Sequence, residues 1–148
     1  MQTRTWTWRN KAAWGVGAWQ AEPDKMQWQD TETGYPCLAK RNNVRVWCGY
    51  VGVAPLHPLY GHDYDSLEVD IAIHGGLTYS AFCNNEGAVE GICHIPEGDE
   101  APHVWWFGFD CGHGGDLVPG LWEDGVYRTL AYAQEQCHRL AAQLKAFE

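Results

Sequence analysis

The sequence predicts an α+β fold: a largely antiparallel sheet of about five to seven strands, backed by one long C-terminal helix, in a single domain spanning residues 1–148. Short runs of β-branched and aromatic residues alternate with glycine- and proline-containing turns, which is typical of antiparallel strands. The C-terminal segment then changes to apolar positions three and four residues apart, which is the spacing of one helix face. A chain of this length is also the common size of one domain.

The first half of the chain predicts three strands. Residues 3–9 alternate tryptophan with threonine and arginine, and residues 14–19 form a second apolar run that glycines weaken. Residues 44–53 are the strongest candidate because β-branched and aromatic side chains recur throughout. Residues 22–37 are rich in turn-forming residues and predict an irregular connection.

In the second half, prolines and a glycine make residues 54–65 a loop. Residues 68–76 alternate acidic and apolar side chains and predict a half-buried strand. The Gly75-Gly76 pair is typical of a tight hairpin turn, with residues 77–83 as the returning strand. Residues 104–109 form the most apolar strand of the chain.

The C-terminal helix is predicted over about residues 124–146, starting after Asp124-Gly125. Its apolar stripe consists of Val126, Leu130, Ala133, Cys137, Leu140, Leu144 and Phe147. We expect the helix to pack on the sheet and bury Leu130, Cys137, Leu140 and Leu144. The alternative is a coiled-coil dimer helix, which the lack of a Leu/Ile-rich seam disfavours. A homo-oligomer stays open.

Charge is distributed unevenly. Residues 1–50 hold seven Lys/Arg and four acids, whereas residues 51–148 hold three Lys/Arg and fifteen acids, so balances of +3 and −12 give the net −9. No Lys or Arg occurs between Arg45 and Arg128. Because affinity for duplex nucleic acid comes largely from neutralised phosphates, this distribution argues against such a partner and against phosphate binding by side chains of the second half.

Six cysteines are present, and no two form a C-x-x-C pair, so a zinc ribbon is not predicted. No apolar run is long enough to span a membrane, and the N-terminus lacks the features of a signal peptide. We therefore expect a cytoplasmic protein with reduced thiols and no membrane partner.

Three histidines follow predicted strands and precede glycines or prolines. A histidine in such a place is open to water and titrates near neutral pH, so it can move protons or bind a metal. If the strand ends meet, they form one pocket with His57, His74 and His113 as catalytic candidates. The neighbouring polar residues are Tyr60, Thr78, Tyr79 and Asp110. The alternative is that each histidine is only a polar turn residue.

A phosphate-bearing ligand has two predicted kinds of partner. The backbone N–H groups of the glycine-rich turns after His74 and around His113 can bind an anion without side-chain charge, and Arg41 and Arg45 flank the strand at 44–53. Aromatic side chains can stack on a base, and the candidates are Tyr60, Tyr79, Trp105 and Trp106. Since side chains alternate along a strand, one of the two adjacent tryptophans must leave the core.

Asp110, His113 and Asp116 are spaced three residues apart and form a possible metal loop. Oxygen and nitrogen ligands suit Zn, Mn, Fe or Mg better than a thiolate-selective ion. A cation here would also supply positive charge in the acidic half of the chain.

Four segments together resemble a family of small proteins encoded by tailed bacteriophages, particularly those of actinobacteria. They are YVGVAPLHPLYGHDYD, IHGGLTYS, VWWFGFDCGHGGD and YRTLAYAQEQCHRLAAQL, so the likeness covers about residues 45–145. The resemblance implies a non-structural phage protein in the bacterial host cytoplasm. By analogy, such a protein is similar in kind to counter-defence proteins that sequester or cleave nucleotide immune signals.

Three functions are consistent with these observations. The first is binding and phosphodiester hydrolysis of a cyclic-nucleotide or ADP-ribose type signal, with His74 and His113 as base and acid. The second is a non-catalytic sponge that uses the same pocket. The third is an acidic protein–protein module that inhibits a host factor.

Overall fold

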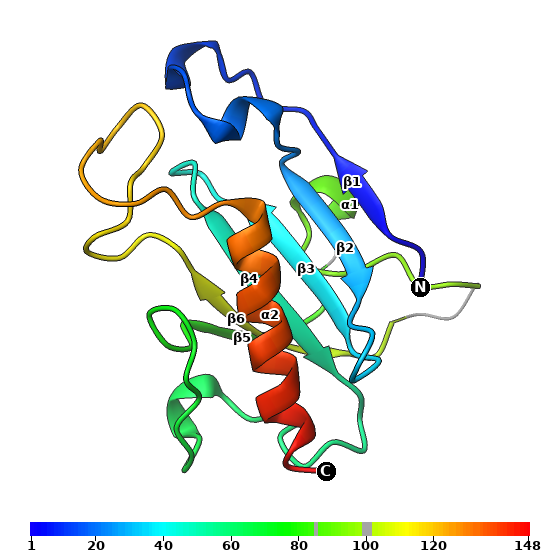
Figure 1. Ribbon diagram of the computed structural model, residues 1–148. Coiled ribbons are helices and arrows are strands. Elements are labelled where there is room, and N and C mark those ends of the chain that lie inside the picture. Colours follow the sequence, from blue (N-terminus) through cyan, green and yellow to red (C-terminus); the bar gives the residue numbers. More distant parts are fainter. Residues whose placement is uncertain (85, 99–101) are drawn as a thin grey trace.

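Six strands form one sheet in the part of the chain that the structure, a computed structural model, describes: residues 1–84, 86–98 and 102–148 (Figure 1). The order is β1-β2-β3-β4-β6-β5, and each neighbouring pair is antiparallel. This confirms the predicted α+β class. The strands are β1 (Arg4–Trp6), β2 (Lys25–Gln29), β3 (Pro36–Arg41), β4 (Trp47–Val53), β5 (Tyr79–Phe82) and β6 (Trp105–Asp110).

The C-terminal helix α2 (Leu130–Lys145) crosses one face of the sheet over β3 and β4 (Figure 1). It begins later than predicted, because residues 116–126 form turns closed by isolated β-bridges. Thr129 caps the helix, and its hydroxyl accepts the Tyr132 N–H at 3.1 Å. Of the predicted stripe, Cys137, Leu140 and Leu144 are buried and Leu130 is partly buried. No helix in the described ranges is long and apolar enough to cross a membrane.

The α2 stripe is covered by the sheet of the same chain, so the coiled-coil alternative is wrong. Gly49 permits the close approach: a methyl group there would collide with the Phe109 ring and come within 2.8 Å of the Cys137 sulfur. The absence of a side chain in β4 thus brings helix and sheet into contact.

Both faces of the sheet are covered. Trp105 packs on the α2 face, and Trp106 packs with Leu38 and Tyr50 on the other face. The two tryptophans therefore point in opposite directions, as predicted from alternation, but Trp106, on the side away from α2, is buried as well. Residues 83–84 and 86–96, with the short helix α1 (Gly87–Glu90), cover the second face, and we call them the covering segment.

Buried polar side chains of β2 hold this covering segment on the sheet. The Lys25 ammonium donates to the carbonyls of Ala88 and Gly91, both at 2.7 Å. The Gln27 amide accepts the Ile95 N–H at 2.8 Å and donates to its carbonyl at 3.2 Å. Both side chains are fully buried, so these hydrogen bonds replace lost hydration.

A disulfide joins Cys83, the first residue of the covering segment, to Cys93. The prediction that all six thiols are reduced is therefore wrong for this pair. The fold brings Cys83, directly after β5, next to Cys93, and the spacing of the two cysteines along the chain did not predict this contact. The free cysteines among the described residues are Cys37, Cys48, Cys111 and Cys137, all buried.

Other predicted elements differ from the structure. Residues 14–19 are not a strand; the 3-10 helices η1 (Ala12–Trp14) and η2 (Ala18–Ala21) lie on either side of a bend. Residues 68–76 contain bends instead of a strand, and η3 (Tyr64–Ser66) precedes them. Conversely, β2 and the first two residues of β3 lie in the stretch, residues 22–37, that predicted an irregular connection.

Candidate functional site

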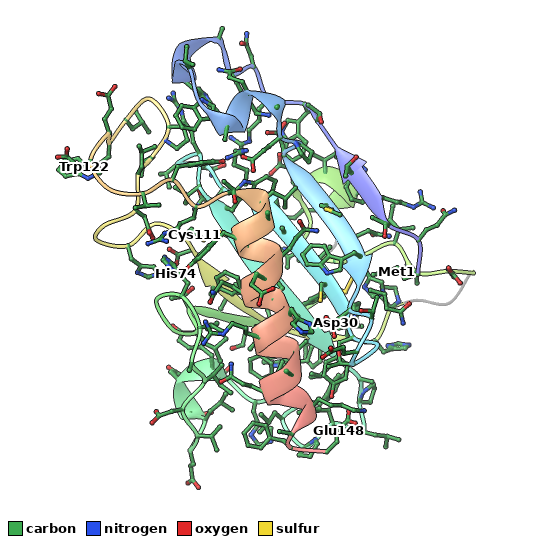
Figure 2. The ribbon with its side chains drawn as sticks, viewed as in Figure 1. Met1, Asp30, His74, Cys111, Trp122 and Glu148 are labelled. Carbon is green, nitrogen blue, oxygen red and sulfur yellow. A yellow bond between two sulfur atoms is a disulfide. The ribbon has the colours of Figure 1, made fainter. Side chains whose placement is uncertain are left out.

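A group of polar side chains gathers beside the first turn of α2, near the end of β6. It comes from the loop before β5, the loop after β6 and the start of the helix. Figure 2 shows His74 on this side of α2, near Cys111. We call the group the histidine cluster, and its members are His74, Asp110, His113, Asp116, Arg128 and Tyr132.

Asp116 is the buried centre of the histidine cluster, with its side chain 1% exposed. Its Oδ1 accepts the Arg128 Nε–H at 2.8 Å. Its Oδ2 accepts the backbone N–H of His113 at 3.0 Å and lies 2.7 Å from His74 Nε2. Burial by itself raises the pKa of this carboxyl, but these hydrogen bonds outweigh it and hold the pKa below its ordinary value.

His74 connects this carboxylate to a phenol. Its Nδ1 lies 2.7 Å from the Tyr132 hydroxyl oxygen. In the tautomer of His74 that carries its proton on Nε2, Nε2 donates to the carboxylate and Nδ1 accepts the phenol proton. Carboxylate, imidazole and hydroxyl thus stand in the order that acid–base chemistry requires, in which a carboxylate orients an imidazole and the imidazole can take the proton of a hydroxyl.

His113 is the second imidazole, and its ring centroid lies 5.9 Å from that of His74. Its Nε2 lies 3.2 Å from Asp110 Oδ1 without a hydrogen bond, and the two groups form an ion pair only when the imidazole is protonated. Asp110 is held by Thr78, whose hydroxyl donates to Oδ2 at 3.2 Å, and by the Gly112 N–H at 2.9 Å. About a third of the His113 side chain is exposed, so this ring can reach a ligand.

An open cleft of about 340 Å³ adjoins the cluster, and His74, Tyr132, Gln136 and Arg139 contribute to its lining. The Arg128 guanidinium lies 4.8 Å from the centroid of the Tyr132 ring. Two arginines thus lie at or beside the cleft, which offers an anionic ligand positive charge.

The structure therefore brings together the predicted residues His74, Thr78, Asp110, His113 and Asp116. They meet because β6 and the loop before β5 are neighbours at this end of the sheet: the Thr78 N–H donates to the Gly108 carbonyl at 2.9 Å.

His57 lies elsewhere, and its prediction as a catalytic residue is corrected. It is buried beside the C-terminal end of α2, with Nε2 2.7 Å from the Leu144 carbonyl. Its Nδ1 accepts the Leu59 N–H at 3.0 Å. Both ring nitrogens are thereby used in satisfying backbone groups of a loop and a helix terminus.

The aromatic candidates are also separate from the cluster. Tyr60 packs against Phe82, with ring centroids 5.6 Å apart. Tyr79 packs edge-on against Tyr50 on the second face of the sheet. Trp105 and Trp106 are buried, so stacking of a base on either indole is excluded by their packing.

Arg41 and Arg45 serve the packing of the N-terminal segment, contrary to their predicted role in holding phosphate. Arg41 is fully buried, 4.5 Å from the Trp47 ring centroid and 3.4 Å from Glu22 and Asp24 oxygens. Arg45 donates to the Pro119 carbonyl at 3.1 Å. The two guanidiniums are fixed by protein groups, so neither is available at the cleft.

The predicted metal ligands do not converge. Within the described part of the chain, the possible ligand atoms of Asp110, His113 and Asp116 do not all lie within 4.8 Å of one another. Both oxygens of Asp116 already accept hydrogen bonds. A metal bound by these residues stays a prediction, which elemental analysis of untagged protein for Zn, Mn and Fe tests.

Two members of the cluster, Arg128 and Tyr132, were not predicted. They are four residues apart, a spacing that places side chains on one helix face. A helix starting at residue 124 would have made them ordinary members of a solvated face. The observed start at Leu130 puts them at the helix entrance, where they meet His74 and Asp116.

Comparison with protein families, curated proteins and solved structures finds no match to this chain. The fold and the site define an α+β protein with an acid–base cluster at one end of its sheet.

Proposed function

We propose that the protein is a bacteriophage counter-defence protein that binds a small nucleotide immune signal at the histidine cluster and hydrolyses its phosphodiester. The phage setting and the host cytoplasm come from the sequence resemblance alone. The observation that carries the chemistry is the hydrogen-bonded chain Asp116–His74–Tyr132, which ends at the cleft.

The proposed reaction uses the two imidazoles as base and acid. An attacking water gives a proton to the Tyr132 oxygen while Tyr132 passes its own proton to His74 Nδ1. The water oxygen forms a bond to phosphorus as the bond to the leaving oxygen breaks. His113, in its protonated form, donates a proton to that leaving oxygen. Arg128 and Arg139 offset the phosphate charge.

A sponge is the second candidate, and one observation favours it. Both nitrogens of His74 are hydrogen-bonded within the protein, so the ring is satisfied without a substrate. In this case the arginines and the glycine-rich turns hold the nucleotide, and no bond is broken.

The test is incubation with a panel of cyclic nucleotides and ADP-ribose derivatives, followed by denaturation and chromatography of the supernatant. New products are expected, and they should disappear in His74→Ala, His113→Ala and Tyr132→Phe. By the size of typical acid–base contributions, each change should lower turnover about 100-fold or more. His103→Ala, an exposed histidine outside the cluster, is the matched control.

Intact nucleotide that is released only on denaturation would support the sponge instead. Depletion of no nucleotide would remove both proposals. Equal turnover by the wild type and Tyr132→Phe would overturn the proton path through the phenol while leaving the hydrolysis itself intact.

A further inference from the structure

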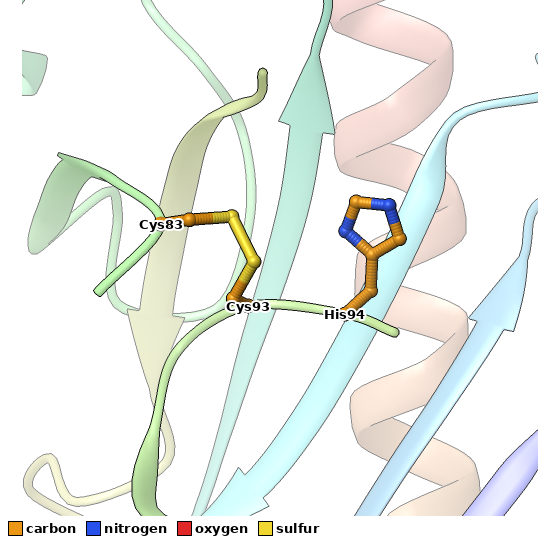
Figure 3. Close-up of side chains that lie close together, drawn as sticks. All are labelled: Cys83, Cys93 and His94. Atoms are coloured by element: carbon orange, nitrogen blue, oxygen red, sulfur yellow. A yellow bond between two sulfur atoms is a disulfide. The ribbon is translucent and has the colours of Figure 1, made fainter. Parts of the chain in front are cut away.

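Three metal-ligand side chains lie together on the second face of the sheet, away from the histidine cluster. Cys83 follows β5, and Cys93 and His94 belong to the covering segment (Figure 3). Each offers one ligand atom, and these atoms all lie within 4.8 Å of one another. Within residues 1–84, 86–98 and 102–148, this is the one group of three possible ligands that meets that limit.

The imidazole of His94 lacks a hydrogen bond that its burial calls for. Its Nδ1 is enclosed and has no hydrogen-bond partner among the described residues. The ring packs edge-on against Trp106, with centroids 5.5 Å apart. A buried polar atom without a partner costs free energy, so its presence beside two sulfurs points to a ligand that it can bind.

The surroundings suit a metal–thiolate centre. The Trp106 indole N–H donates to Cys83 Sγ at 3.2 Å, and such a hydrogen bond stabilises a thiolate and orients it. A cavity of about 330 Å³ adjoins the site, lined in part by Cys93 and His94. It leaves room for a fourth ligand from solvent.

We propose that the reduced protein binds one Zn²⁺ through Cys83, Cys93 and His94, with the fourth position facing the cavity. Two cysteines, one histidine and an exchangeable ligand form a recognised tetrahedral zinc set. The site is independent of the proposed nucleotide chemistry, and it uses none of the residues first predicted as ligands.

The disulfide and the zinc site are alternative states of the same pair of sulfurs. A dithiol reductant gives two electrons and two protons to the Cys83–Cys93 bond, which yields two thiols and the oxidised reductant. Zn²⁺ then displaces both thiol protons and binds the two thiolates. In a reducing cytoplasm, where protein disulfides are rare, the metal-binding state is the one expected.

The test uses Co²⁺ as a coloured substitute for Zn²⁺. Protein reduced with a dithiol, then freed of it without oxygen, is titrated with Co²⁺ and afterwards with Zn²⁺. We expect one Co²⁺ per chain, with thiolate-to-cobalt absorption in the near ultraviolet and tetrahedral bands in the visible. Zn²⁺ should bleach both. The disulfide form should show neither, because its sulfurs carry no ionisable thiol.

Variants separate this site from the buried thiols. Cys83→Ser or Cys93→Ser alone should lower the thiolate-to-cobalt absorption, because one sulfur is left, and the two together should abolish it. His94→Ala should weaken Co²⁺ binding at least tenfold. Cys48→Ala is the matched control, because Cys48 lies on the same face outside the group. Zn²⁺ should also raise the melting temperature of the reduced wild type, which requires no variant to fold.

Three results would overturn the proposal: reduced wild type that takes up no Co²⁺, bound Co²⁺ without thiolate absorption, or binding that survives both cysteine substitutions. Reduced protein that is unfolded and stays unfolded with Zn²⁺ would overturn it as well.

Discussion

At the scale of single residues, two buried aspartates differ in what their histidine partners contact. Asp116 pairs with His74, which is itself largely buried and bonded to Tyr132. Asp30 pairs with His138, whose side chain is 38% exposed. The first histidine is enclosed in a chain of hydrogen bonds, whereas the second contacts its aspartate at the surface of α2.

The Asp30–His138 pair predicts a pH effect. The 2.8 Å contact with Asp30, against a smaller desolvation effect, raises the pKa of His138 above its ordinary 6.5. Because the pKa of His138 is higher in the folded state, its protonation adds to the free energy of unfolding. This contribution is complete below pH 6.5 and is lost as the pH rises through the folded-state pKa. NMR titration should therefore show His138 above 6.5, and Asp30→Asn should lower its pKa. Glu32→Gln, at a more exposed partner 3.5 Å away, should lower it less; an equal effect of the two variants would contradict the assignment.

Gly75 and Gly76 allow a second test at this scale. Both have positive φ, 67° and 77°, so alanine at either costs about 1 kcal/mol of stability. Only a methyl group at Gly75 would collide with the His113 imidazole; nothing lies within 4 Å of one at Gly76. Gly75→Ala should shift the His113 ring resonances and separate His113 from Asp110, and Gly76→Ala should not. Identical His113 spectra would show that Gly75 does not position this ring.

Sequence reasoning found part of this site for an identifiable reason. His74 and His113 lie next to glycines at loop positions, and Asp110 ends a strongly predicted strand, so these positions can be recognised locally. Arg128 and Tyr132 act only because α2 begins at Leu130 and its entrance faces the loop after β6. That arrangement depends on the strand order and on the long-range contacts of Asp116, which residue spacing does not encode.

At the scale of elements, β2 was not predicted from the sequence, and its inward side chains are polar. β2 places Lys25 and Gln27 toward a covering segment that supplies carbonyl and amide partners. A pattern of apolar and polar residues assumes that polar side chains face water. In β2 the polar side chains face backbone groups of the covering segment, so the usual alternation of buried apolar and exposed polar residues is missing from its sequence. The strong strands β4 and β6 were predicted because both of their faces are apolar.

Lys25 should be essential for holding the covering segment. Burial, aided by Lys40, lowers the pKa of Lys25 to about 8. This value is still above neutral pH, so the side chain stays an ammonium there and donates to its two carbonyl partners. Lys25→Met leaves those carbonyls without a donor and should cost about 2 kcal/mol of stability. Hydrogen exchange of residues 86–96 should rise with it. Lys40→Met removes a partly exposed ion pair with Glu90 and a charge that repels Lys25, and it should cost under about 1 kcal/mol.

The Lys25 and Lys40 variants bear on the same segment from neighbouring strands, so their comparison isolates the buried contacts. Faster exchange confined to the Lys40 variant would contradict the role given to Lys25.

At the scale of the whole molecule, α2 is the element to which distant segments are attached. Glu22, from the N-terminal segment, accepts the Leu130 N–H at 2.6 Å, and Asp30 bonds His138 on the helix. Asp116 bonds Arg128 just before it. These carboxylates come from the N-terminal segment, the β2–β3 turn and the loop after β6. Some of the many acidic residues therefore do not face solvent but join other segments to α2 through hydrogen bonds.

The consequence is a fold that should lose stability in acid as one unit. Burial raises the pKa values of Asp24, Asp30 and Asp116, but hydrogen bonds to each outweigh it and hold the pKa below the ordinary 3.8. A depressed folded pKa gives stability that is present above the unfolded value and is lost as pH falls through the folded one. Urea midpoints should therefore be steady near pH 6 and fall steeply below about pH 4, with tryptophan fluorescence and circular dichroism changing together.

Asp116→Asn should be less stable at pH 6 and show a shallower acid dependence, because its contribution to proton linkage is gone. Asp124→Asn, at an exposed position, should follow the wild type. Parallel curves for the wild type and Asp116→Asn would mean that acid unfolding originates elsewhere.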